Sequence, residues 1–151
     1  MKRLAIIASH GTLDGAYPPF ILASTAIALG WEAGIFFTFY GLQLLRKDLD
    51  LRVTSLGNPA MPMPLPVFAQ TLPGMEAMMT AMMKKQINDK GVASIEELRA
   101  ICVESGVRLI ACQMTADLFG YADDDFIAGV ERGGAATFLE FAGEADVSLF
   151  M

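Results

Sequence analysis

The run Arg3-Leu-Ala-Ile-Ile-Ala-Ser9 decides the fold class, because it is short, continuous and apolar. Such a run is typical of a strand that is buried on both faces, as in a parallel sheet. His10-Gly-Thr-Leu-Asp-Gly15 follows with the composition of a loop. A helix is then predicted from Pro18, where proline suits a first turn, to a stop at Gly30. A strand, a loop and a helix in this order form the unit of an α/β domain.

The same alternation continues to the end of the chain. Further strands are predicted at 35–40, 51–56, 107–111 and 146–150, and further helices at 41–47, 73–90, 94–105, 113–119 and 133–141. Ser94 and Glu97 form a capping-box pattern at the start of one helix. Four prolines make 57–66 a loop. The pattern predicts one α/β domain over 1–151, with a mostly parallel sheet and helices on both faces.

Composition excludes several classes of protein. Hydrophobic residues make up 54% of the 151 positions and charged residues 19%, which is enough apolar material for a core. The net charge of −6 offers no basic face for nucleic acid. One histidine and two cysteines supply no four-ligand metal set, and no phosphate-binding loop or other cofactor motif is present. We expect neither a metal nor a cofactor.

The cysteine count and the hydropathy pattern predict a cytoplasmic protein. Two cysteines form no disulfide framework, and the N-terminus has no signal-peptide pattern. Between Ala16 and Leu45 the only charge is Glu32, which resembles a membrane signal. Pro18-Pro19 opens this stretch and 30–34 divides it, so each half is too short to span. We expect a buried helix and a buried strand there, without membrane association.

Ligands of open α/β sheets bind at the carboxyl ends of the strands, and three polar loops are predicted at that edge. They are 10–14, 57–59 and 112–115. Cys112 is the leading candidate, because it ends a strand and precedes a helix, where backbone N–H groups stabilise a thiolate. A thiolate is the nucleophile that sulfur exchange requires. The alternative is an inert, buried cysteine that packs as a small hydrophobe.

Two other residues also have two interpretations each. Cys102, within a helix, either packs in the core or serves as a second sulfur-handling thiol. It forms no Cys-x-x-Cys pair with Cys112, so a thioredoxin-type mechanism is not supported. His10, the only histidine, either exchanges a proton or places a cation beside the thiolate, or it bonds to loop backbone.

Methionines recur on one face of the helix predicted at 73–90. Met75, Met78, Met79, Met82 and Met83 follow the i, i+3, i+4, i+7, i+8 spacing. Such a stripe is typical of a core or of a subunit contact. We favour a subunit contact and predict a homo-oligomer.

Several motifs together resemble the DsrE-like family, also called DsrE/DsrF/DrsH-like and sometimes labelled "peroxiredoxin family". They are Ser9-His10-Gly11-Thr12-Leu13-Asp14, Ala16-Tyr17-Pro18-Pro19, Phe36-Phe37-Thr38-Phe39, Gly57-Asn58-Pro59-Ala60-Met61-Pro62-Met63-Pro64, Leu72-Pro73-Gly74-Met75, Leu109-Ile110-Ala111-Cys112-Gln113-Met114-Thr115 and Gly133-Gly134-Ala135-Ala136-Thr137-Phe138-Leu139. These blocks cover nearly the whole chain in order. The resemblance implies a three-layer α/β/α sandwich, homo-oligomers, and sulfur relay with TusA-like carriers and rhodanese-like donors.

The resemblance also assigns roles to residues. Cys112 matches the family's sulfur-binding cysteine, and Cys102 matches a second cysteine found in part of the subgroup. The implied function is a sulfurtransferase or carrier that holds sulfane sulfur on Cys112 and passes it to a partner thiol. The residues expected to shape an anion pocket are His10, Gly11, Thr12, Asn58, Gln113 and Thr115. The alternatives are a structural subunit with an inert Cys112 and a thiol peroxidase, although neither cysteine has the Pro-x-x-x-Thr-x-x-Cys setting of true peroxiredoxins.

Overall fold

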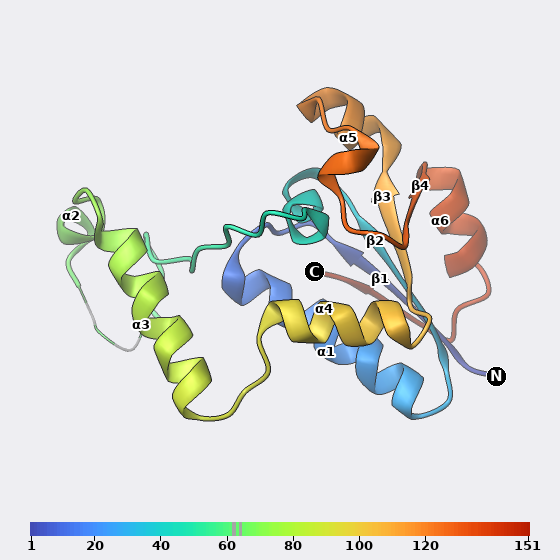
Figure 1. Cartoon of the computed structure of the whole chain (residues 1–151), viewed down its shortest axis with the longest axis horizontal. Coiled ribbons are helices and arrows are strands. Elements are labelled where there is room, and N and C mark those ends of the chain that lie inside the picture. Colours follow the sequence, from blue (N-terminus) through green and yellow to red (C-terminus); the bar gives the residue numbers. More distant parts are fainter. Residues whose placement is uncertain (62, 64) are drawn as a thin grey trace.

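A five-stranded, wholly parallel sheet forms the centre of the molecule (Figure 1). The computed structural model describes residues 1–61, 63 and 65–151. The strands are β1 (Arg3–Ala8), β2 (Glu32–Phe37), β3 (Arg108–Cys112), β4 (Val130–Gly133) and β5 (Val147–Phe150), in the order β4-β3-β2-β1-β5. Because β5 pairs with β1, the chain crosses back over the sheet after β4. The predicted α/β class and the predominantly parallel sheet are therefore confirmed.

Helices cover both faces of this sheet, which makes the domain a three-layer sandwich. The helices α1 (Leu13–Ala28) and α4 (Ile95–Glu104) pack on one face, and α6 (Ala135–Ala142) packs on the other. Adjacent residues of β2 point to opposite layers: the Phe37 ring contacts Phe20 of α1, whereas the Phe36 ring stacks on Phe138 of α6 at 5.1 Å. Both faces of the central strands are thus buried, as their continuous apolar runs predict.

The first helix begins earlier than predicted, at Leu13 instead of Pro18. The Thr12 hydroxyl caps it by accepting a hydrogen bond from the Gly15 N–H at 3.0 Å. Pro18 and Pro19 therefore lie inside the helix. The cap residue determines the start here, although each proline withdraws one backbone donor.

The strand predicted at 51–56 is wrong. The backbone there has other partners: the Val53 N–H donates to the Thr80 hydroxyl at 3.1 Å, and the Arg52 carbonyl accepts from the Leu13 N–H at 2.9 Å. In its place the sheet gains β4, whose sequence Val-Glu-Arg-Gly lacks an apolar run. This edge strand is held partly by the ion pair between Glu131 and Arg108.

The strand predicted at 35–40 ends at Phe37, and the chain continues as the 3₁₀ helix η1 (Phe39–Leu45) where an ordinary helix was expected at 41–47. The buried Arg99 of α4 holds the end of η1 by donating hydrogen bonds to the carbonyls of Leu44 and Arg46 at 2.9 and 2.8 Å. The position of η1 matters because it borders the carboxyl edge of the sheet.

The remaining elements are short or lie to one side of the sheet. They are α2 (Val67–Gln70), α3 (Met75–Asp89), α5 (Gln113–Phe119) and η2 (Asp123–Asp125). Figure 1 shows α2 and α3 beside the sandwich. Pro62 and Pro64 of the loop predicted at 57–66 lie outside the described residues. Among the helices described, none combines the length and apolar character that a membrane crossing requires.

Candidate functional site

Cys112 is the last residue of β3 and also the N-cap of α5, so the chain turns from strand to helix at the thiol. The residue is 5% exposed. On the neighbouring strand it pairs with Gly133, where a side chain would meet Ile110 and Thr137 at 3.0–3.1 Å. The missing side chain of Gly133 therefore keeps the backbone of β4 close beside Cys112.

The surroundings of the Cys112 thiol favour its thiolate. Burial raises the pKa, but this effect is outweighed by the polar groups near the sulfur, which are the Thr115 hydroxyl and N–H, the Thr38 hydroxyl and the Met114 N–H. The pKa of Cys112 therefore lies below the ordinary value of a cysteine. The two N–H groups are free to face the sulfur because the first turn of a helix has no carbonyl partners for them.

Thr115 is fully buried and is oriented by η1. Its hydroxyl oxygen accepts a hydrogen bond from the Phe39 N–H at 3.1 Å and lies 3.5 Å from the Thr38 hydroxyl oxygen. With an acceptor site occupied by Phe39, the hydroxyl proton of Thr115 is available to the sulfur. Two threonines from different segments thus meet at the thiol.

The start of η1 carries the backbone strain of this region. Phe39 has a φ of 47°. Among the residues that the structure describes, it is the one residue other than glycine whose φ is positive. Such conformations cost free energy and persist only where the surroundings enforce them. Gly41, two residues on, lies so close to β1 that an added Cβ would overlap the Ala8 carbonyl oxygen. The start of η1, which supplies Thr38 and the Phe39 N–H, therefore packs closely against the carboxyl end of β1.

The structure separates His10 from Cys112. His10 is exposed, and its Nδ1 lies 3.3 Å from the Ser9 hydroxyl. In the sheet register Ala8 pairs with Phe37, which pairs with Ala111, so the two loops leave strands two positions apart. Two strand spacings amount to about 10 Å, beyond hydrogen-bond reach.

The other predicted pocket residues divide into two groups. Thr115 contacts the thiol, and Gln113 lies next to it but donates to the Asp117 carboxylate at 2.9 Å. Gly11 and Thr12 border a separate hollow, which they share with Gln43 of η1 and residues 52–56 and which Cys112 does not line. Asn58 stabilises its own loop, donating to the Thr54 carbonyl and accepting from the Ala60 N–H.

Cys102 lies in a different environment, fully buried between α4 and α1. Its thiol donates to the Phe20 carbonyl at 3.7 Å. Burial raises the pKa of Cys102 to about 11, against an ordinary value of 9.0. This environment favours the packing interpretation over that of a second sulfur-handling thiol.

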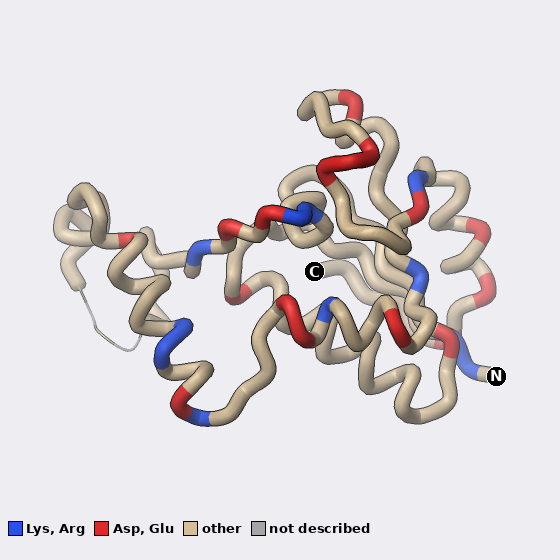
Figure 2. Tube along the Cα trace, viewed as in Figure 1, with Lys and Arg blue, Asp and Glu red and all other residues tan. Residues whose placement is uncertain are grey.

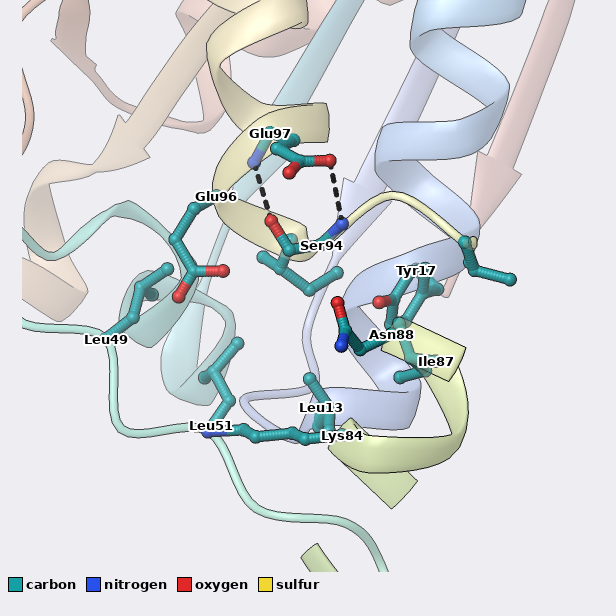
Figure 3. A pocket seen from close by; sticks show the side chains of 12 residues that line it. Leu13, Tyr17, Leu49, Leu51, Lys84, Ile87, Asn88, Ser94, Glu96 and Glu97 are labelled. Atoms are coloured by element: carbon teal, nitrogen blue, oxygen red, sulfur yellow. Dashed lines mark hydrogen bonds between the residues drawn. The ribbon is translucent and has the colours of Figure 1, made fainter. Parts of the chain in front are cut away.

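A pocket of about 210 Å³ lies away from the thiol, between α1, α3 and the start of α4 (Figure 3). Leu13, Leu51 and Ile87 form much of its wall. Figure 3 also shows the reciprocal hydrogen bonds between Ser94 and Glu97, which confirm the predicted capping box. Neither cysteine lines this pocket, which lies between α3 and the body of the domain.

Sequence reasoning missed the part that η1 plays at the site. Thr38 stands inside the motif 36–39, but its predicted place in a strand gave no reason to direct it at Cys112. The positive φ of Phe39 has no signal in its residue type. Across the described ranges, no group of three or more His, Cys, Asp and Glu side chains is placed to hold a metal ion.

Comparison with known proteins gives a family and two curated relatives. The model of the DsrE/DsrF/DrsH-like family matches residues 1–150. The sulfur carrier protein DsrE2 of Allochromatium vinosum is 62% identical over 99% of this chain and 98% of its own length. The uncharacterized protein YrkE of Bacillus subtilis is 30% identical over 99% of this chain and 97% of its own.

Two solved structures share the fold at low sequence identity. The ychN protein of E. coli superposes with a TM-score of 0.58 at 14% identity, over all of both chains. The protein MTH1491 of Methanobacterium thermoautotrophicum, described as of unknown function, gives a TM-score of 0.51 at 13% identity over 99% of each chain. With a parallel sandwich, a family model that matches 150 of 151 positions and a relative at 62% identity, the chain belongs to the DsrE/DsrF/DrsH-like family.

Proposed function

We propose that this protein is a sulfur carrier that holds sulfane sulfur on Cys112 and passes it to a partner thiol. The observation that carries the proposal is the place of Cys112 at the turn from β3 into α5, beside the hydroxyls of Thr115 and Thr38, and these surroundings lower its pKa despite burial. The name of the Allochromatium relative, a sulfur carrier protein, supports the same role. The setting we propose is the reducing cytoplasm, where thiols stay free.

Loading follows from ordinary thiol chemistry. The Cys112 thiolate attacks the terminal sulfur of a donor persulfide, R–S–SH. A new bond forms between Sγ and that sulfur, the donor S–S bond breaks, and the donor leaves as the thiolate R–S⁻. The product, Cys112–S–SH, keeps the proton of the transferred sulfur, so charge and oxidation state balance across the step.

Unloading is the same exchange in reverse, with a partner thiolate as the attacking group. The transferred sulfur stands one S–S bond, about 2 Å, beyond Sγ. That distance matters because Sγ itself belongs to a residue only 5% exposed. The terminal sulfur of the persulfide is therefore the atom that an acceptor reaches, which is the requirement for a carrier.

Intact-mass spectrometry after incubation with inorganic polysulfide tests the proposal. Wild type and Cys102→Ser should gain sulfur on one residue, and Cys112→Ser should gain none. Loading of Cys112→Ser to the wild-type extent would refute the role of Cys112. An unloaded wild type would favour the alternative of a structural subunit, and sulfenic acid formed rapidly with peroxide would favour a thiol peroxidase.

We also propose that the methionine face of α3 contacts a second copy of the chain. Met79 is buried within the protomer, whereas Met78 and Met82 remain 44% and 45% exposed. Half-exposed methionines on one helix face are typical of a contact surface. Light scattering on the double variant Met78→Glu/Met82→Glu should give a smaller particle than wild type, and an unchanged mass would contradict the proposal.

A further inference from the structure

Apolar side chains surround the Cys112 site on the outside of the molecule. Tyr40, Met114 and Leu118 are 65%, 64% and 62% exposed, and Phe39 is 44% exposed. The rings of Phe39, Tyr40, Phe119 and Tyr121 contact one another in sequence, with centroids 5.9–6.4 Å apart. We call this set the thiol face: Phe39, Tyr40, Met114, Leu118, Phe119 and Tyr121.

The thiol face is attached directly to the reactive centre. The Phe39 N–H bonds to Thr115, and Met114 supplies one of the N–H groups that face the sulfur. Leu118 lies one helical turn from Met114, on the same side of α5. A partner that covers these side chains therefore lies over Cys112.

Acidic side chains border the thiol face, and we call them the acidic rim: Asp117, Asp123, Asp124 and Asp125. Between Arg108 and Arg132 the sequence holds five acidic residues and no lysine or arginine. Figure 2 shows these acids together around α5 and η2. Three cations also lie near the rim. Arg132 pairs with Asp123 and its side chain is 24% exposed, the Arg46 guanidinium lies over the Tyr121 ring, and the Lys47 N–H donates to the Asp125 carbonyl.

The rim is joined to the site through β4. Asp123 pairs with Arg132, and Arg132 lies opposite Ala111 in the sheet, next to Cys112. Asp124 is exposed, and its side chain enters no hydrogen bond or ion pair in the described part of the chain. Its charge is therefore available to an approaching molecule.

We propose that the thiol face is the docking surface for a protein that presents its own thiol between apolar residues on a basic surface. The proposal rests on the sulfur-carrier function and specifies the partner at the same site. Aromatic and methionine side chains are the types enriched in interface cores, and the rim selects the partner by charge. The excess of acid also disfavours an anionic membrane surface.

Two cysteine peptides serve as probes, one with lysines and leucines around the cysteine and one with glutamates in place of the lysines. Full-length protein is first loaded with inorganic polysulfide to the Cys112 persulfide. The peptide thiolate attacks the outer sulfur, a peptide persulfide forms, the Cys112 S–S bond breaks and the Cys112 thiolate leaves, and intact-mass spectrometry of the protein follows the loss of one sulfur. At low salt the lysine peptide should react about tenfold faster than the glutamate peptide, and added salt should reduce the ratio.

Matched variants identify the groups responsible. Asp124→Lys should lower the ratio of the two rates about threefold, whereas Glu104→Lys, the same change at the far end of α4, should preserve it. Leu118→Ser should slow both peptides, whereas Leu139→Ser should not, because Leu139 is equally exposed at 64% but lies on α6.

Three outcomes would overturn the proposal. They are equal rates for the two peptides, equal effects of Asp124→Lys and Glu104→Lys, and binding to anionic vesicles that Leu118→Ser abolishes. The last would assign the face to a membrane. None of these outcomes affects the loading of Cys112 by inorganic polysulfide, which needs no docking surface. Failure of docking is therefore distinguishable from failure of the carrier function.

Discussion

Replacing Thr115 by valine tests the physical basis of the site. Valine keeps the shape of the side chain but removes the hydroxyl that bonds to the Cys112 sulfur. A hydrogen bond to a charged group contributes about 1.5–3 kcal/mol, so its loss lowers the thiolate fraction below neutral pH about 10- to 100-fold. A thiolate of higher pKa is also a stronger nucleophile, and this gain offsets about half of the lost reactivity on a logarithmic scale. We expect iodoacetamide to alkylate the variant about three- to tenfold more slowly at pH 6.

Thr80→Val is the matched control for this experiment. Thr80 is also buried, and its hydroxyl also accepts a backbone hydrogen bond at 3.1 Å, from Val53 instead of Phe39. Each variant leaves one N–H without its acceptor and should lose about 1–3 kcal/mol of stability. Only Thr115→Val should slow alkylation of Cys112. If both variants react as wild type does, the hydroxyl of Thr115 does not stabilise the thiolate and the reasoning is refuted.

Three further predictions concern stability. Burial raises the pKa of Cys102 to about 11, so its neutral thiol contributes stability that is complete below pH 9 and is lost as the pH rises to 11. Between these two pH values, urea unfolding should show that wild type loses about 2 kcal/mol more stability than Cys102→Ala. Equal losses in the two proteins would contradict this prediction. Thr12→Ala should lower stability by about 1 kcal/mol through the lost helix cap while sulfur loading stays unchanged, and slower loading by mass spectrometry would instead place Thr12 at the site. Gly41→Ala should cost at least about 2 kcal/mol in urea unfolding because its Cβ meets a backbone carbonyl, whereas Gly134→Ala, with open space around it, should change little.

The sequence was sufficient for the sheet and its main helices because their signals are local. Continuous apolar runs mark β1, β2 and β3, and the capping box marks the start of α4. Strand β4 carries no such signal, since its alternating charges are stabilised by a partner 23 positions away, Arg108. The segment 51–56 has the residue types of a strand, yet its hydrogen bonds go to α3 and to the start of α1. Tertiary contacts therefore determine that β4 is a strand and that 51–56 is not.

The candidate site shows the same division between local and distant information. Cys112 and Thr115 were selected from the sequence because a strand end and a helix start can be recognised locally. Thr38 was not, because its direction depends on where β2 stops and η1 turns. His10 and Asn58 belong to polar loops as predicted, but register and loop geometry carry them away from the thiol. Residue type alone does not determine which residues of neighbouring strands pair, so it could not show this separation.

The two cysteines show why position in the fold, and not residue type, determines thiol chemistry. Both are at most 5% exposed, yet the pKa is raised at Cys102 and lowered at Cys112. Cys102 lies within α4, where the N–H groups of its own helix are already bonded along the helix, so desolvation outweighs the one opposing influence, a backbone hydrogen bond from Ser24. Cys112 stands where a strand becomes a helix, and the unpartnered N–H groups of the first turn meet two threonine hydroxyls there. An exchange of these environments would therefore exchange the reactivities, which is the physical reason to assign the sulfur to Cys112.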